Sequence, residues 1–72
     1  MPVFTVMAEN AEGDTVKLHN EAVRVAAHAV ATVERFRLKG FRNIRIYRET
    51  QEINEAELRA DVLSEGAGGS QR

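Results

Sequence analysis

The chain has 72 residues, a formal net charge of -1 and 43% hydrophobic residues. That length supports one small domain, which buries only about 60% of the surface that its unfolded chain exposes and therefore has a small core. The sequence has no cysteine, which excludes a disulfide framework and a thiolate zinc site and is typical of a cytoplasmic protein. No apolar run approaches the roughly 20 residues of a membrane-spanning helix, so no membrane partner is expected.

The first predicted element is a strand over residues 2–8, PVFTVMA. The segment is rich in β-branched and aromatic side chains, and its proline stands at the first position, where a strand tolerates it. Because side chains alternate along a strand, Phe4 and Val6 share one face. The other face carries Val3, Thr5 and Met7.

A turn is predicted over residues 9–14, ENAEGD, and polar and apolar residues then alternate over residues 15–19, TVKLH. The two strands form a predicted hairpin in which Val16 and Leu18 face the core. The outward residues of this strand are then Thr15, Lys17 and His19. A competing interpretation takes Asp14 as a helix N-cap, with a helix that begins directly after it.

Residues 21–39 carry the clearest helical pattern of the chain. Apolar residues recur with a period of about 3.6 and form one broad stripe, which is typical of a helix packed on a sheet. The stripe consists of Ala22, Ala26, Ala29, Val33 and Phe36. Asn20 is the predicted N-cap, and Gly40 ends the helix because glycine adopts the left-handed conformation at little cost.

Residues 41–49, FRNIRIYRE, directly follow the glycine that ends this helix and predict a further strand. Alternation directs Ile44 and Ile46 toward the helix. The opposite face of the strand carries Asn43, Arg45 and Tyr47.

A second, short helix is predicted to begin near Glu55, because Asn54 and Glu57 have the spacing of a capping box. Its apolar residues form a thin stripe that can dock on the domain, and they are Leu58, Val62 and Leu63. Residues 65–72 are rich in glycine and serine and lack apolar bulk, which predicts a disordered tail. The single domain is therefore expected to span residues 1–64.

These elements predict a two-layer α+β fold in ββαβα order. The sheet has three antiparallel strands with the first strand in the centre, one long helix packed on one face, and a short C-terminal helix. If residues 15–19 are helical instead, the order is βαβα. Two strands are too few for a stable sheet, so dimerisation would then complete it.

One face of the predicted sheet has no helix over it. Val3, Met7 and Tyr47 are expected there, and they form the candidate self-association face. A small core, an uncovered face and free strand edges all favour a second copy of the chain as a partner, as a homodimer. The leading interpretation is therefore a non-enzymatic protein-interaction module of otherwise unknown function.

The segment RFRLKGFRNIRIYR, residues 35–48, holds six basic residues and no acidic one. It supports an alternative function, in which the basic surface between Arg24 and Arg48 binds single-stranded nucleic acid or another polyanion. The candidate residues are Arg24, Arg35, Lys39, Arg45 and Tyr47. Against this alternative, cations in the last turn of a helix complement its dipole whatever the function, and the net charge does not favour nucleic acid.

No catalytic, metal-binding or cofactor-binding residue is predicted. The histidines His19 and His28 are nine residues apart in the sequence and do not have the spacing of a shared metal site. The glycine-rich segment at residues 66–70 lacks the lysine and the following helix of a phosphate-binding loop. The chain is accordingly not expected to be an enzyme.

Overall fold

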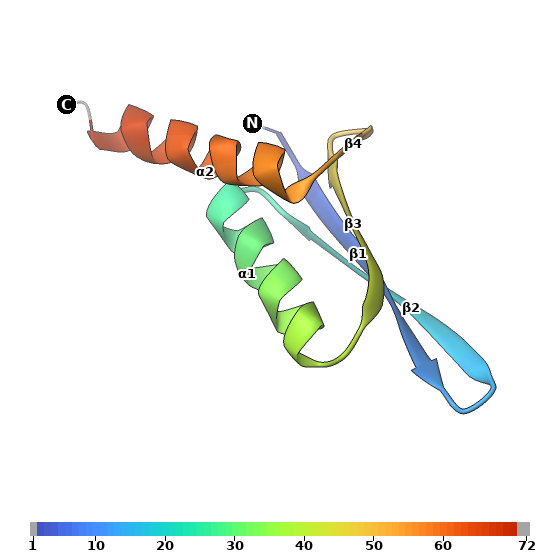
Figure 1. Ribbon diagram of the computed structural model, residues 1–72. Helices are drawn as coiled ribbons and strands as arrows, with labels where there is room; N and C mark the ends of the chain where they lie inside the picture. The colour runs from blue at the N-terminus through green and yellow to red at the C-terminus, as the bar shows by residue number, and fades with distance from the viewer. Residues whose placement is uncertain (1, 71–72) are drawn as a thin grey trace.

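The computed structural model describes residues 2–70, with the side chains described as far as residue 65. Its elements follow the order ββαββα and form a four-stranded antiparallel sheet with the strand order β2-β1-β3-β4 (Figure 1). The strands are β1 (Phe4–Glu12), β2 (Thr15–Val23), β3 (Arg42–Arg48) and β4 (Gln51–Ile53), and the helices are α1 (Ala26–Leu38) and α2 (Glu55–Ser70). The predicted α+β class, with an antiparallel sheet and two helices, is confirmed.

The predicted strand count is wrong, because the sheet has four strands rather than three. The additional strand, β4, pairs with β3 through a two-residue turn at Glu49 and Thr50. Neither turn residue is glycine, although Glu49 has a positive φ of 57°. Its backbone N–H donates to the carbonyl oxygen of Val3 at 2.8 Å, and its carboxylate accepts from the Val3 N–H at 2.6 Å. Contacts with the start of the chain therefore hold a turn for which the local sequence gives no signal.

Residues 15–19 are a strand, so the hairpin prediction is confirmed over its helical alternative. The strand is longer than expected, however, and the helix begins at Ala26 rather than at residue 21. Asn20 is therefore not an N-cap but pairs with Met7 in the sheet. Strand pairing along the full length of β1 outweighs the local helical pattern at the start of the predicted stripe. Ala22, which was predicted to lie in the apolar stripe of the helix, is therefore part of the sheet.

The predicted faces of β2 are wrong. Only Gly13 and Asp14 separate the paired residues Glu12 and Thr15, so even-numbered residues of β1 share a face with odd-numbered residues of β2. Phe4 and Val6 face the helices, and their neighbours across the hairpin on that face are Val23 and Glu21, not the two apolar residues expected there. Those two residues, Val16 and Leu18, are 52% and 70% exposed.

The odd-numbered residues of β2 that were expected to face outward, Thr15, Lys17 and His19, lie instead on the helix side of the sheet. The ring of His19 stacks on Phe41, with 4.6 Å between the ring centroids. The two-residue hairpin turn fixes this arrangement, because it sets the register of every pair along the two strands.

The hydrophobic core lies between one face of the sheet and the two helices. It consists of Phe4, Val6, Ala8, Ala26, Ala29, Val33, Phe36, Ile46, Ile53 and Leu58. Leu58 belongs to α2 and is 0% exposed, so the second helix is part of the core. The capping box predicted for this helix is confirmed, because the Glu57 N–H donates to Asn54 Oδ1 at 2.8 Å and the Asn54 N–H donates to Glu57 Oε1 at 3.1 Å.

Helix α2 runs to Ser70 and extends into the predicted tail, residues 65–72. Residues 71 and 72 lie outside the described residues, and the division between domain and tail stays a prediction. Among residues 2–70, neither helix combines the length and the apolar character needed to cross a membrane.

Gly40 ends α1 as predicted, with a φ of 82°. The Gly40 N–H donates to the Arg37 carbonyl oxygen and the Phe41 N–H to that of Phe36, both at 3.0 Å, which is the hydrogen-bond pattern of a Schellman motif. The rings of Phe36 and Phe41 meet at 5.2 Å and supply the hydrophobic contact that accompanies this motif.

We expect Gly40→Ala to lower the free energy of unfolding by about 1 kcal/mol, because an added Cβ disfavours the left-handed conformation. No atom lies within 4 Å of such a Cβ, so the cost comes from the backbone and not from a clash. Urea unfolding measures it. Gly40→Asn is the matched control and should lose less, since asparagine tolerates this conformation. An equal loss in both variants would point to another cause.

The N-terminus of α1 is capped from a distance. Val25 occupies the N-cap position and supplies no side-chain hydrogen bond. The carboxylate of Glu65, on α2, instead accepts the Ala26 N–H at 3.0 and 3.1 Å. A negative charge at this position also complements the helix dipole.

Replacing Glu65 by alanine should therefore destabilise the domain by about 1 kcal/mol, the usual cost of losing a cap. Chemical denaturation gives the value, and Ser64→Ala, one residue earlier on the same helix, serves as the control with little expected change. Equal stability of the Glu65→Ala variant and the wild type would show that α2 does not cap α1.

Candidate functional site

The face of the sheet opposite the two helices is uncovered, and we call it the open face. Its residues alternate with the core residues along each strand, and the strand register brings them together. The open face consists of Thr5, Met7, Glu9 and Ala11 from β1, Val16, Leu18, Asn20 and Ala22 from β2, Arg42, Arg45 and Tyr47 from β3, and Glu52 from β4. The β1–β2 hairpin extends past both helices, at the lower right of Figure 1, so the sheet is longer than its helical cover.

Apolar side chains form the centre of the open face. Met7 lies beside Arg45 across β1 and β3, and Tyr47 lies beside Thr5. Leu18 is opposite Glu9 on the β2 side. A shallow concavity of about 250 Å³ lies among these strands. Its lining residues are Met7, Ala8, Glu9, Leu18, Asn43, Arg45 and Tyr47.

Charges of both signs surround this apolar centre. Arg45 is exposed, and within the described part of the chain it forms no ion pair. Glu9 accepts a hydrogen bond from Asn43 Nδ2 at 2.8 Å, and Glu52 lies opposite Tyr47 at the β4 edge. Arg42 lies opposite Glu9 across β1 and β3. The open face therefore offers an apolar centre with two cations and two carboxylates around it.

The three residues predicted for self-association lie on the open side of the sheet. Met7 and Tyr47 are half-buried members of the open face, and Val3 precedes β1 with the same alternation. Sequence reasoning missed Val16 and Leu18, which it placed in the core. The length of the hairpin turn is the sequence signal that identifies these two residues. With a two-residue turn, the numbers of paired residues add to an odd sum, so even-numbered residues of β2 share a face with odd-numbered residues of β1.

The five residues predicted for polyanion binding do not form one surface. Arg35 and Lys39 lie at the C-terminal end of α1, on the helix side of the sheet. Arg45 and Tyr47 lie on the open face, and Arg24 is exposed in the connection between β2 and α1. Arg45 and Tyr47 are therefore brought together, while the helix separates the other cations from them.

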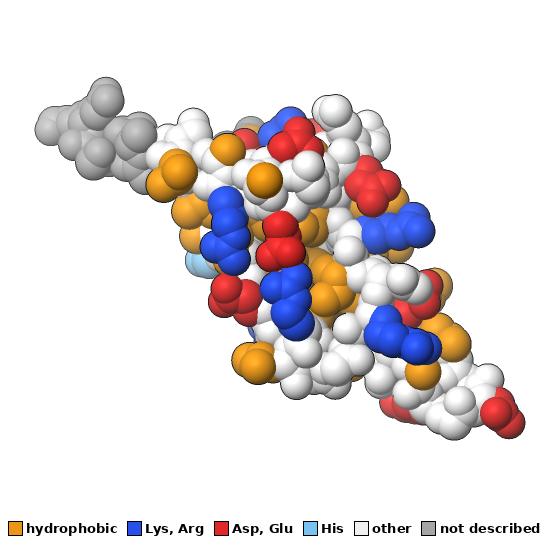
Figure 2. All heavy atoms as spheres, viewed as in Figure 1, with side chains coloured by type: hydrophobic (Ala, Val, Ile, Leu, Met, Phe, Trp, Pro, Cys, Tyr) orange, Lys and Arg blue, Asp and Glu red, His pale blue; other side chains and the backbone are white. Residues whose placement is uncertain are grey.

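Much of the basic segment is neutralised within the chain. Arg35 pairs with Glu21, Arg37 with Glu55 at 2.7 Å, and Arg48 with Asp61 at 2.8 Å. The pKa of Glu21 is lowered by the hydrogen bond from Arg35. The pKa of Glu55 is likewise lowered by the hydrogen bond from Arg37, and the pKa of Arg37 is raised in turn. Figure 2 shows the result on the helix side, where basic and acidic side chains lie next to one another.

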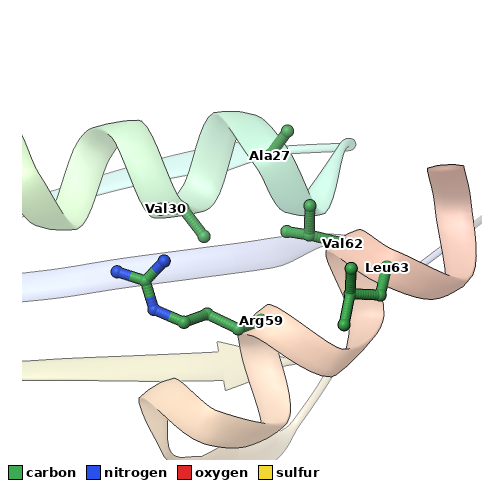
Figure 3. A pocket seen from close by; sticks show the side chains of 5 residues that line it. All are labelled: Ala27, Val30, Arg59, Val62 and Leu63. Atoms are coloured by element: carbon green, nitrogen blue, oxygen red, sulfur yellow. The ribbon is translucent and has the colours of Figure 1, made fainter.

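A groove runs between the two helices, with a volume of about 360 Å³. Its lining residues are Ala27, Val30, Arg59, Val62 and Leu63 (Figure 3). The Arg59 guanidinium pairs with Glu34 at 3.6 Å and with Glu55 at 3.9 Å. Because its cation is balanced by two carboxylates, this groove offers apolar contact but little attraction for a charged ligand.

Within the described residues, no group of three or more histidine, cysteine, aspartate or glutamate side chains is placed to hold a metal ion. His28 is exposed on α1. Nε2 of His19 is buried and has no hydrogen-bond partner within the described residues. The open face combines apolar side chains with charges of both signs, and we take it as the candidate functional site. Comparisons of the chain with protein-family models, with curated proteins and with solved structures find no match.

Proposed function

We propose that the protein is a non-enzymatic interaction module that binds a second copy of its own chain through the open face. The observation that carries the proposal is the position of both helices on one side of the sheet. This position leaves apolar side chains such as Leu18, at 70% exposure, without cover. The cysteine-free composition supports a cytoplasmic location as part of the same proposal.

Charge complementarity favours a second copy over an unrelated partner. The open face carries two cations, Arg42 and Arg45, and two carboxylates, Glu9 and Glu52. When two such faces meet about a two-fold axis, the cations of each can lie against the carboxylates of the other. Such an interface is self-complementary in charge and joins the two apolar centres around Met7 and Tyr47.

The area of the face is sufficient for a modest interface. Strand spacings of about 4.8 Å and rises of about 3.4 Å per residue give the four strands roughly 500 Å² of flat area. Side chains project from this plane and increase its accessible area. The result is about 600 Å² per partner, which is the low end for specific interfaces. Burying an exposed leucine contributes about 1.5–3 kcal/mol, so Leu18 supplies a substantial part of the association energy.

Light scattering coupled to size-exclusion chromatography tests the proposal. We expect a mass of at least twice the 8.0 kDa of one chain, with dissociation on dilution. Moderate salt should weaken the association only slightly, because apolar contact provides most of it. A mass of 8.0 kDa at millimolar concentration would rule the proposal out.

Polyanion binding is the alternative function of the open face. Arg45 and Tyr47 lie together on an uncovered sheet, an arrangement that can hold a single nucleic-acid strand. Anisotropy of a labelled single-stranded oligonucleotide should show no binding at low salt if the open face is occupied by a second copy. Tight binding that weakens steeply with added salt, and that dissociates the dimer, would favour the polyanion function instead.

A further inference from the structure

β2 forms an outer edge of the sheet. It has nine residues and no proline, and it pairs with β1 along its whole length. Its outer side leaves every second residue's N–H and C=O without a strand partner. Long edges of this kind accept another strand unless the protein blocks them. The opposite edge, β4, has only three residues.

We propose that this edge pairs with β2 of a second copy, antiparallel and in the register centred on His19. The two sheets then become one continuous eight-stranded sheet. This interface is separate from the open face, because it uses the side of β2 rather than the face of the sheet. It therefore adds to the proposed function and does not depend on it.

Charge selects the register. With His19 on the two-fold axis, Lys17 of each copy lies opposite Glu21 of the other. A register centred on the residue before or after His19 places Lys17 opposite a histidine or a valine instead. Directly opposed side chains of opposite charge stabilise a pair of strands. Lysine on an edge strand commonly discourages pairing, but in this register each lysine meets a carboxylate.

A concavity lies beside the edge, at the position where that lysine would arrive. It has a volume of about 260 Å³ and lies between β2 and α1, and its lining residues are Glu21, Val23, His28, Ala31, Thr32 and Arg35. Glu21 is held at this site by Arg35 and by Thr32 Oγ1, which donates to it at 3.2 Å. The position of the carboxylate is therefore fixed before the second copy arrives.

The incoming lysine also brings a carboxylate of its own. Lys17 Nζ lies 3.4 Å from Glu12 Oε1 in the same chain. In the paired edge, Arg35 and Glu21 of one copy are followed by Lys17 and Glu12 of the other, so the four charges alternate in sign. The two-fold axis repeats this row at the other end of the paired strands.

The pairing also extends the open face. Val16 then lies opposite Ala22 of the second copy, and Leu18 lies opposite Asn20, all on the uncovered side of the sheet. Two such eight-stranded sheets can pack through their open faces about a perpendicular two-fold axis. With both interfaces formed, the assembly has four chains.

Two charge reversals on β2 test the edge. Lys17→Glu sets a carboxylate against Glu21 of the second copy, and Glu21→Lys sets two lysines against each other. Each variant alone should lose edge pairing and halve the mass measured by light scattering. An equimolar mixture of the two variants restores opposite charges at both positions and should recover the full mass. No recovery in the mixture would overturn the register.

Tyr47→Lys separates this inference from the proposed function, because it adds a further cation beside Arg45 on the open face and leaves β2 unchanged. We expect four chains in the wild type, two in Lys17→Glu and two in Tyr47→Lys. The variant that combines Lys17→Glu with Tyr47→Lys should be a single chain. If Lys17→Glu leaves the mass unchanged while Tyr47→Lys halves it, the edge interface is wrong and the open-face interface stands. If Tyr47→Lys leaves the mass unchanged while Lys17→Glu halves it, the open-face interface is wrong and the edge interface stands.

Lys17→Glu also loses the contact with Glu12 in its own chain. The double variant Glu12→Lys, Lys17→Glu restores that contact with reversed signs and still opposes Glu21 of the second copy. It should therefore behave as the single variant does. Full mass in this double variant would overturn the edge pairing, and circular dichroism establishes that each variant is folded.

Discussion

Leu58→Ala is expected to destabilise the domain by about 2–5 kcal/mol, the range for truncating a fully buried leucine. Leu58 is 0% exposed and joins α2 to the core of Phe4, Val6 and Ile46. A core of this size supplies only about 3–5 kcal/mol in total. The variant should therefore be largely unfolded at 25 °C, as measured by circular dichroism and urea titration.

The matched control is Leu63→Ala, on the same helix and with the same chemical change. Leu63 is 74% exposed, so its truncation should change the free energy of unfolding by no more than about 0.5 kcal/mol. Equal stability of the two variants would mean that α2 does not dock through Leu58. The helix layer over the sheet would then consist of α1 alone.

The second large effect concerns self-association. Leu18→Lys places a cation in the apolar centre of the open face and should remove open-face pairing, so that the measured mass is halved. Leu18 lies at the surface, and its replacement should leave the fold intact. Light scattering and circular dichroism on the same samples separate the two effects.

Leu38→Lys provides the matched control, since Leu38 is 89% exposed and lies on α1, away from the open face. Its replacement should leave the mass unchanged. A mass halved by both variants would show that general surface hydrophobicity, and not the open face, drives association. If Leu38→Lys alone lowered the measured mass, the interface would lie on the helices and not on the open face.

Local signals in the sequence predict the C-terminal end of α1 and the start of α2. The glycine at position 40 and the capping box of Asn54 and Glu57 depend on contacts within a few residues, and each is present. The start of α1 is different, because the cap comes from Glu65 on another helix. The sequence near Val25 contains no pattern that predicts a capping residue so far away in the chain.

The strand faces show a second limit. Alternation along β2 correctly separates Val16 and Leu18 from Lys17, but it does not say which set faces the core. The length of the turn at Gly13 and Asp14 determines which set faces the core. This length could not be read from the sequence, because the end of β1 is polar and resembles a turn. The basic segment was ambiguous for a similar reason, because Glu21, Glu55 and Asp61 reach it only in the folded chain.

The most direct test of the open-face interface is an isotope-filtered NMR experiment on a mixture of labelled and unlabelled chains. It detects contacts between protons of different copies. We predict cross-peaks between the Tyr47 ring of one copy and the methyl groups of Met7 and Leu18 of another. Intermolecular contacts confined to α1 and α2, with none at these three residues, would contradict the account.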